Sequence, residues 1–573
     1  MTKCREPSRP NRTLRSHAAP AWVIRLAVLS AGVAGCNGPI HLRLADHVSR
    51  PNPRVVMFFI DGVDRRLFGS WLASGELPNI RRYLADRGTE VLHAVSCVPT
   101  VTYANTATLL TGRRPGHHGV VGNKWFDRRR MFYQDYGYSE TYSRINHDVT
   151  GPTIYELLPD RFTVSIQSPL TRGVSRTYDN LITGSVTWWL GFIDWTDRLP
   201  PLRYEEIAQE ASADSKGCWP EFIHTYFPAV DEYGHRYGTR SWQYKYAVRN
   251  ADHQIGRICG GLKEAGLFDR TTFVLVSDHG MVDVAPGQQF DVAKALARQF
   301  GRKVPATWPE LSTNYRERQD YLNRYDTLAT PDGVRKCGVY FRFAEDWTER
   351  PTHVEAATPS LLGAKRPTAD GRSPSVGTIA RWLASQPAVW IAAVPVGPNE
   401  VALYGAGGVA VVSRKGIGKS AVYRYAVREG TDPLGYQDHP SAGRRVDGGF
   451  HSAEDWFDAT IETAAPDLPG QICELFDSDR AGEIVLFAAS GWGFSTWEHA
   501  GHGSITAEEM FVPMIWAGPD IPAGQKLNRA RTCDVTPTIL EILHAPEQSA
   551  VGPPFDGTSL LSRLRKPDGV AGL

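Results

Sequence analysis

Six Asp and His residues follow short apolar runs in this 573-residue sequence, at points where predicted strands end. They are Asp61, Asp231, His235, Asp278, His279 and His502. Carboxylate oxygens and imidazole nitrogens together are ligands that zinc and similar divalent ions prefer. One Asp after a strand is usually a turn or a helix cap, and one His in a loop is usually solvated. Because the pattern recurs along the chain, it favours a metal centre over six unrelated turns.

The apolar runs before these residues predict a buried sheet. Residues 55–60 lead to Asp61, and residues 273–277 lead to Asp278. Further strands are predicted at 222–227, 484–489 and 511–517, and amphipathic helices at 78–87 and 242–262. Continuous apolar strands that alternate with helices indicate an α/β fold with a mostly parallel central sheet flanked by helices. Side chains that follow such strands meet at one edge of the sheet, where ligands bind.

The segments that contain these residues have a characteristic order and spacing. They are 58–62 (FFIDG), 99–105 (PTVTYAN), 110–120 (LTGRRPGHHGV), 231–238 (DEYGHRYG), 277–281 (SDHGM) and 502–504 (HGS). Together they resemble the alkaline phosphatase superfamily, and within it the type I phosphodiesterase/nucleotide pyrophosphatase branch. The resemblance spans most of residues 54–520 and implies an alkaline-phosphatase-like fold.

The resemblance also implies a site with two divalent metal ions, and zinc suits the mixed ligands best. One ion would be held by Asp231, His235 and His502. The other would be held by Asp61, Asp278, His279 and the side-chain oxygen of Thr102. In such a site a metal ion lowers the pKa of a hydroxyl group, and a second ion stabilises the leaving oxygen.

Thr102 is the nucleophile that the resemblance implies, and its attack would give a phosphothreonine intermediate that water then hydrolyses. It precedes Tyr103 at the start of a predicted helix, whose N-terminus favours phosphate oxygens. Thr100 is a rival nucleophile, but its place in the motif indicates a helix-entry residue. Asn105 resembles the family residue that donates a hydrogen bond to a non-bridging phosphate oxygen.

We therefore expect a hydrolase of small-molecule phosphate esters that cleaves diesters or nucleotide pyrophosphate bonds. Monoesterases of this superfamily gain from an Arg that donates to two phosphate oxygens, and no segment of this sequence identifies such an Arg. This favours a diester, whose second substituent would rest on aromatic side chains of an insertion. The alternatives are a phosphomonoesterase or phosphonate hydrolase of the same superfamily and, remotely, an inactive lipid-anchored binding protein. A sulfatase is disfavoured because Val101 stands where the sulfatase signature that begins at Cys97 has Arg.

Residues 1–36 have the pattern of a bacterial signal peptide. Six basic residues lead into the apolar run 26–34, which is too short to span a membrane. The run ends in VAGC at 33–36, which resembles a lipoprotein cleavage box, so a lipid on Cys36 would tether the exported protein to a membrane of the cell envelope. The net charge of +1 gives no field that attracts a polyanion, and we expect no specific nucleic-acid binding.

The rest of the chain is predicted to have three parts after a linker at 37–53. Residues 54–283 and 466–573 would form the catalytic α/β core. Residues 284–465 contain Pro- and Gly-rich stretches and a predicted hairpin at 401–412, and we interpret them as an inserted cap region. The aromatic cluster at 188–195 is expected to be part of the core, with a place in the same cap as the alternative. Six cysteines follow Cys36, and their spacing leaves the disulfide pairing open.

Overall fold

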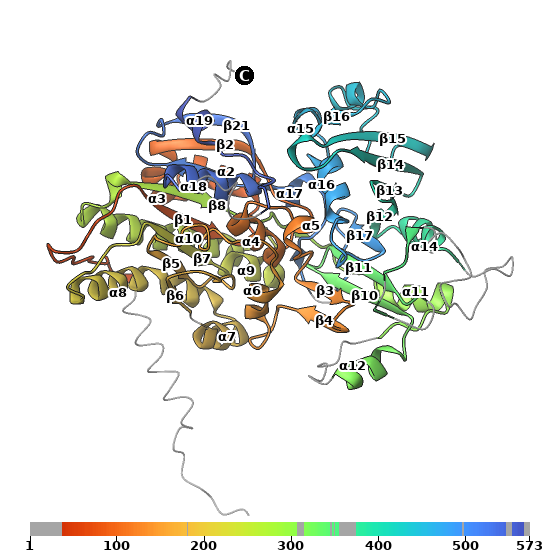
Figure 1. Cartoon of the computed structure of the whole chain (residues 1–573), viewed down its shortest axis with the longest axis horizontal. Coiled ribbons are helices and arrows are strands. Elements are labelled where there is room, and N and C mark those ends of the chain that lie inside the picture. The colour runs from red at the N-terminus through yellow and green to blue at the C-terminus, as the bar shows by residue number, and fades with distance from the viewer. Residues whose placement is uncertain are drawn as a thin grey trace, which may run out of the picture.

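The computed structural model describes residues 37–179, 181–305, 315–343, 347–348, 350–353, 374–495, 498–545 and 553–566. Figure 1 shows two parts side by side, each built around a sheet. The predicted signal peptide, with Cys36, lies outside the described residues. Within these ranges, none of the helices combines the length and the apolar character that crossing a bilayer requires.

The first part is built on a nine-stranded sheet. In spatial order the strands are β19 (Phe511–Val512), β2 (Gly88–Val95), β20 (Met514–Ala517), β8 (Thr271–Val276), β1 (Arg54–Ile60), β7 (Phe222–Phe227), β5 (Thr163–Ile166) and β6 (Arg176–Tyr178), with β21 (Gln525–Arg531) paired to β2. The strands from β8 to β6 are all parallel, whereas β19 and β20 are antiparallel to their neighbours. The predicted mostly parallel sheet is confirmed. The strand predicted at 511–517 is interrupted at Pro513, which has no N–H to donate.

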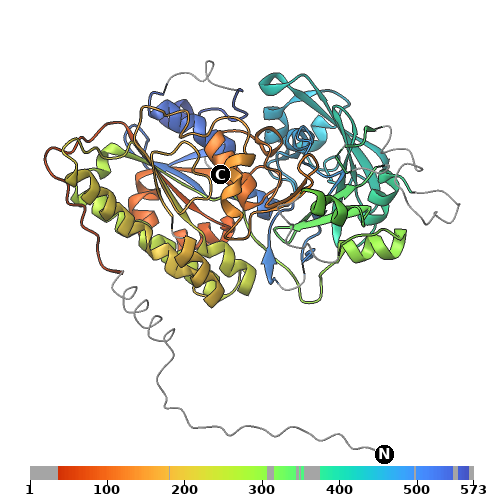
Figure 2. The same ribbon diagram turned by 60° about the horizontal axis from the view of Figure 1, so that its bottom comes forward.

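Helices cover both faces of this sheet (Figures 1 and 2). One face packs against α2 (Arg65–Ala73), α3 (Pro78–Tyr83), α8 (Pro200–Ala213) and α10 (Trp242–Glu264), and the other against α4 (Thr102–Thr111) and α18 (Val535–Ile542). Alternate side chains of β1 enter the two cores, with Phe58 on the α10 side and Phe59 on the α4 side. Because both sides are buried, the strand is a continuous apolar run in the sequence.

The second part is an eight-stranded antiparallel sheet. Its order is β10 (Thr327–Asp332), β11 (Lys336–Phe341), β17 (Ile484–Ala488), β12 (Val389–Gly397), β13 (Glu400–Tyr404), β14 (Gly408–Lys415), β15 (Val422–Gly430) and β16 (His451–Ser452). The predicted hairpin at 401–412 is confirmed as β13 and β14. One face packs against α11 (Val292–Phe300) and α14 (Val376–Ala384), and the other against α15 (Ala453–Thr460) and α16 (Leu468–Leu475).

Two sequence-based placements differ from the structure. β17 was expected in the catalytic sheet but pairs with β11 and β12, because a fully buried apolar run does not indicate which sheet it joins. The aromatic cluster is also not core: Trp188 and Trp189, in α7 (Leu181–Leu190), are 47% and 77% exposed, and Phe192 is 47% exposed.

Candidate active site

Three neighbouring parallel strands place three carboxylates at one edge of the central sheet. β1 lies between β7 and β8. Asp61 directly follows β1, Asp278 follows β8, and Asp231 lies in α9 (Ala229–Tyr237), which begins just after β7. The carboxyl ends of the strands therefore bring together residues that are up to 217 positions apart in the sequence.

Gly62 allows two of these carboxylates to approach. Its φ of +64° lies in the left-handed region, and a Cβ atom there would be 2.8 Å from the Cα, Cβ and Oδ1 atoms of Asp231. Any other residue would thus combine backbone strain with a collision. The glycine after Asp61 is a packing requirement of the site.

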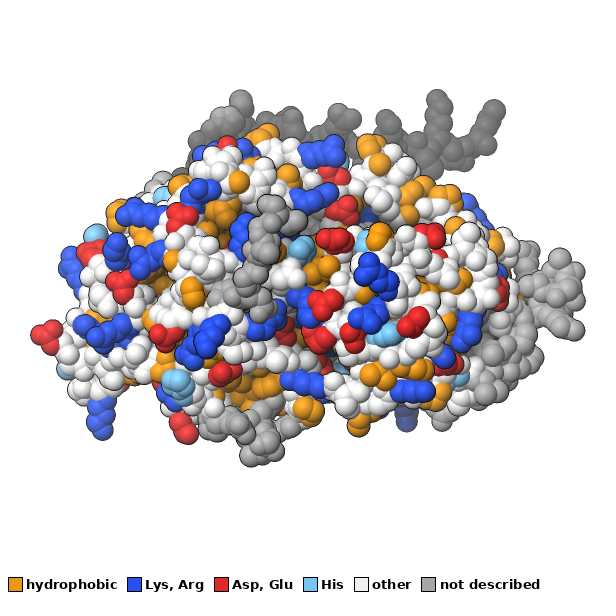
Figure 3. Space-filling view, turned by 90° about the horizontal axis from the view of Figure 1, so that it is seen from above, with side chains coloured by type: hydrophobic (Ala, Val, Ile, Leu, Met, Phe, Trp, Pro, Cys, Tyr) orange, Lys and Arg blue, Asp and Glu red, His pale blue; other side chains and the backbone are white. Residues whose placement is uncertain are grey.

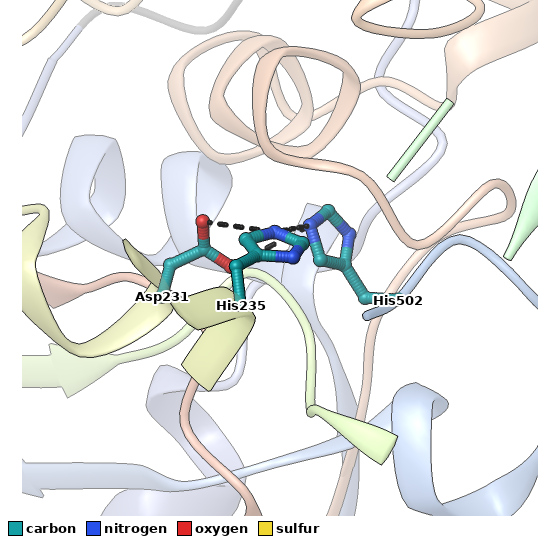
Figure 4. A group of neighbouring side chains, drawn as sticks. All are labelled: Asp231, His235 and His502. Atoms are coloured by element: carbon teal, nitrogen blue, oxygen red, sulfur yellow. Dashed lines mark hydrogen bonds and ion pairs between the residues drawn. The ribbon is translucent and has the colours of Figure 1, made fainter. Parts of the chain in front are cut away.

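Asp231, His235 and His502 form the first group of side chains that can hold a metal ion (Figure 4). The Nε2 atoms of the two imidazoles are 3.2 Å apart, and they lie 3.4 Å (His235) and 3.5 Å (His502) from oxygens of Asp231. Each ring has its Nδ1 atom next to a backbone carbonyl, that of Ala500 for His235 at 2.9 Å and that of Thr100 for His502 at 2.8 Å. With Nδ1 as the donor in these bonds, both Nε2 lone pairs face the centre of the group.

A second group lies beside the first. The Nε2 atom of His279 is 3.4 Å from Asp61 Oδ1, 3.2 Å from Asp278 Oδ2 and 3.1 Å from the Oγ1 atom of Thr102. Ligand atoms of Asp61, His279 and Asp231 also lie within 4.8 Å of one another, so Asp231 is close to both groups. The imidazoles of His279 and His502 stack with centroids 3.5 Å apart. The structure thus brings all six predicted side-chain ligands and Thr102 into one site.

The chemistry of these groups fits divalent cations. Asp231 Oδ1 and Asp278 Oδ2 are buried and have no hydrogen-bond partner among the described residues. Burial raises the pKa of Asp61 and of Asp278, and the charge of a neighbouring carboxylate raises each further. Buried carboxylates that repel one another and lack donors are stabilised by a bound cation, and the mixed O and N atoms suit zinc.

Thr102 is the first residue of α4, and its side chain faces this group of ligands. Its Oγ1 atom lies 3.5 Å from Asp61 Oδ1, to which it donates, and 3.1 Å from His279 Nε2. The hydroxyl of Thr100, by contrast, donates to the backbone oxygen of Ser504 at 2.7 Å and accepts from the N–H of Gly503. The geometry thus favours Thr102 over Thr100 as the nucleophile.

The predicted role of Asn105 needs correction. Its side chain is completely buried, and its amide nitrogen donates to the carbonyls of Cys97, Pro99 and Val101, while its Oδ1 atom accepts from the N–H of Cys97. These hydrogen bonds connect the side-chain amide of Asn105 to the backbone of the loop that precedes Thr102. Asn105 therefore fixes this loop and does not present a donor to phosphate.

Asn123 is a residue that the sequence reasoning missed. It lines a cavity together with Thr102, and its Oδ1 atom accepts a hydrogen bond of 2.8 Å from the N–H of Tyr103 in the first turn of α4. With the oxygen fixed in this way, the amide N–H groups remain as donors beside Thr102. The only signal in the sequence is that Asn123 follows the 110–120 segment closely, and only the fold shows that this loop returns to α4.

Two cavities meet at Thr102. One, of about 450 Å³, is mainly aromatic, and its lining includes Tyr103, Tyr136, Tyr138, Tyr142, Trp188, Trp189 and Tyr226. The other, of about 560 Å³, is polar, and its lining includes Asn123, Lys124, Asp135, Glu232, Asp332 and Glu498. The aromatic wall comes from residues 103–226 and not from the predicted insertion, whose residues line the polar cavity instead.

The predicted insertion instead supports His502. In the turn between β10 and β11, the carbonyl of Gly333 accepts from the N–H of His502 at 2.7 Å, and the N–H of Arg335 donates to the carbonyl of His502 at 3.0 Å. The turn passes so close that a Cβ atom on Gly333 would be 2.9 Å from the imidazole ring. A ligand from residues 466–573 is thus positioned by residues from 284–465.

Comparisons with known proteins agree with this arrangement. Residues 55–336 match the family model for type I phosphodiesterase / nucleotide pyrophosphatase. Ectonucleotide pyrophosphatase/phosphodiesterase family member 1 of Rattus norvegicus is 26% identical over 302 residues, which cover 51% of this chain and 31% of that protein. A venom phosphodiesterase of Macrovipera lebetinus is 24% identical over 242 residues, which cover 40% of this chain and 26% of that protein. The chain therefore aligns with about a third or less of the length of these relatives.

A solved structure shares the fold. Murine ectonucleotide pyrophosphatase/phosphodiesterase 5 superposes with a TM-score of 0.52 at 15% sequence identity, covering 88% of this chain and 97% of that one. The family match covers the segment that contains Asp61, Thr102, Asp231 and Asp278. The family model and these relatives place residues 55–336 of the chain in the type I phosphodiesterase/nucleotide pyrophosphatase branch of the alkaline phosphatase superfamily.

Proposed function

We propose that this protein hydrolyses phosphate diesters or nucleotide pyrophosphate bonds through a phosphothreonine intermediate on Thr102, at a site that holds two divalent metal ions, most suitably zinc. The observation that supports this best is the position of the Thr102 hydroxyl, 3.1 Å from His279 Nε2 at the junction of the two cavities. The family match and the names of the relatives, which are phosphodiesterases and nucleotide pyrophosphatases, support the same reaction class.

We assign the ligands to the two ions as follows. Asp231, His235 and His502 would hold one ion, and Asp61, Asp278 and His279, with Thr102, the other. When bound, the ions supply positive charge that lowers the pKa of the Thr102 hydroxyl and stabilises negative charge on the phosphate and the leaving group.

The chain's own residues orient the reaction. The Thr102 oxygen attacks phosphorus, an O–P bond forms, and the bond from phosphorus to the leaving oxygen breaks. The N-terminus of α4 and the amide of Asn123 favour the negative phosphate oxygens beside Thr102. A water molecule then attacks the phosphothreonine, which releases the second product and restores the hydroxyl group.

Room on two sides of Thr102 favours a diester. A substrate phosphate at Thr102 can direct one substituent into the aromatic cavity and the other into the polar cavity. Among the described residues that line these cavities, Lys124 is the one Lys or Arg side chain, and it lies 3.3 Å from Asp135. No Arg is thus placed to fork onto two terminal phosphate oxygens, as a monoesterase requires.

We also propose export and attachment to the bacterial cell envelope through a lipid on Cys36. The support is the signal-peptide pattern of residues 1–36 and the extracellular character that the prefix "ecto" gives to the relatives. The six cysteines of the described residues are free.

The reaction class is tested by comparing bis-p-nitrophenyl phosphate with p-nitrophenyl phosphate as substrates, with added zinc and again after chelation. We expect a clear preference for the diester and loss of the activity in the chelator. A preference for the monoester would favour a phosphomonoesterase instead. Full activity after exhaustive removal of metal would contradict the two-metal site.

A further inference from the structure

Most of the exposed large apolar side chains of the described residues lie in one stretch of the sequence. Eleven such residues are exposed, and eight of them lie between positions 138 and 246. These eight are Tyr138, Val186, Trp188, Trp189, Phe192, Tyr237, Trp242 and Tyr246, and we call them the apolar patch. Single exposed apolar residues are ordinary, but a concentration of Trp and Tyr marks a contact surface.

The patch is held together by a buried polar network. Asp194, in the 3₁₀ helix Ile193–Arg198, accepts hydrogen bonds from the hydroxyls of Tyr233 in α9 and Tyr246 in α10. The guanidinium of Arg236 lies over the ring of Trp188, 5.2 Å from its centroid, and donates to the carbonyl of that residue at 2.8 Å. α7, α9 and α10 therefore present their aromatic side chains as one fixed surface.

Three residues of this surface also line the aromatic cavity. Tyr138, Trp188 and Trp189 belong both to the patch and to the lining of the cavity, which has Thr102 among its residues. Phe192 and Trp242 lie outside the cavity lining and extend the apolar surface beyond it.

The start of the described chain is attached to a helix that contributes to the patch. Gly38, two residues after Cys36, accepts a hydrogen bond of 2.6 Å from Arg257 of α10, and Ile40 is buried against Gly261 of the same helix. Trp242 begins this helix, about 22 Å from Arg257 at 1.5 Å per residue. Figure 1 shows α7 on the lower side and the first described residues at the left end, near α8, whereas the upper face carries acidic and basic side chains interspersed (Figure 3).

We propose that the apolar patch docks on the surface of a lipid bilayer. Trp and Tyr are the side chains that partition into the interface between lipid head groups and acyl chains. Arg240, two residues before Trp242, lies 3.8 Å from Asp283, and its side chain is 93% exposed, so it presents a cation to phospholipid phosphates. The patch would add a second attachment to the membrane beside the proposed lipid anchor.

Hydrogen–deuterium exchange of the full chain tests this contact directly. The protein is compared with and without vesicles of phosphatidylethanolamine and phosphatidylglycerol. We expect slower exchange at 184–192 and 237–246 with vesicles, and no change in β14 and β15. Unchanged exchange in both patch segments while the protein sediments with the vesicles would overturn the proposal in favour of a tether alone. If exchange in these two segments slows as the protein concentration rises in the absence of vesicles, the proposal is overturned in favour of self-association.

Variants separate the patch from the anchor. In a full chain with Cys36→Ser, the substitutions Phe192→Ser and Trp242→Ser should each lower the vesicle partition coefficient about tenfold. The matched control is Ile417→Ser, which removes an apolar residue that is 81% exposed, more than Phe192 or Trp242, and that lies outside the patch. All three variants should keep the rate on a soluble diester, because none of these residues lines either cavity. Equal partition of the control and the patch variants would refute the proposal.

Discussion

Arg335 and Glu509 form an ion pair in which neither side chain is exposed to solvent. The pair is bidentate, with Nε to Oε1 at 3.0 Å and Nη2 to Oε2 at 3.3 Å. Arg335 donates its backbone N–H to the carbonyl of His502, and Glu509 accepts from the N–H of Ser504 at 2.9 Å. The pair therefore clamps the backbone on both sides of a predicted metal ligand and connects the second sheet to the active site.

Glu509→Gln should impair both stability and turnover. The substitution leaves Arg335 buried without a counter-charge, which costs about 3–5 kcal/mol of unfolding free energy, and it frees the loop that positions His502. Urea unfolding and kcat on the diester measure the two effects. The matched control is Glu483→Gln, which breaks a buried pair with Arg128 away from the site. It should lose stability but keep kcat; equal loss of kcat in both variants would show that the clamp has no specific role.

Gly62→Ala should nearly abolish activity. A Cβ atom would lie 2.8 Å from Asp231, so Asp61 and Asp231 must move apart. Gly266→Ala is a suitable control, because Gly266 has a similar φ of +68° but open space around its Cβ position. Both variants carry backbone strain of about 1 kcal/mol, but only Gly62→Ala should lower metal content and kcat. Similar kinetics of the two variants would contradict the close packing at Asp231.

Asp231→Asn and His235→Asn should differ in metal content. Asp231 is close to both groups of ligands, whereas His235 contacts only the first. We expect Asp231→Asn to weaken the binding of both ions and His235→Asn that of one. Elemental analysis after dialysis at a series of free zinc concentrations measures this. Identical titrations of the two variants would show that Asp231 does not connect the groups.

The charged form of His117 should stabilise the fold, so the protein should become less stable as His117 loses its proton at alkaline pH. Burial opposes a charged ring, but hydrogen bonds with Asp477 and Asp556 raise the pKa of His117 from 6.5 to about 9. The resulting stabilisation is complete below pH 6.5 and is lost as the pH rises through about 9. Urea unfolding across this range should show a loss on the order of 2 kcal/mol that His117→Asn lacks. The same pH slope in the variant would assign the loss to other groups.

The six Asp and His residues could be predicted from the sequence. Each of them follows a strand or lies about one helical turn from a residue that follows a strand. Asp61 and Asp278 end apolar runs, and parallel strands bring such ends together. The role of Asn105 was not predictable, because its amide partners depend on how the loop at 97–101 folds back. The sheet to which β17 belongs and the exposure of Trp189 depend on tertiary packing, which periodicity alone does not describe.

The nucleophile is tested most directly by the turnover of Thr102→Ala on bis-p-nitrophenyl phosphate, measured beside Thr100→Ala with both proteins at full zinc occupancy. Thr102→Ala removes the attacking oxygen but none of the six Asp and His side chains, so it should keep the fold and the metal ions while kcat falls at least about a thousandfold. Thr100→Ala should keep a measurable rate, because Thr100 only supports the loop of His502. Turnover of Thr102→Ala near the parent rate would contradict the covalent mechanism.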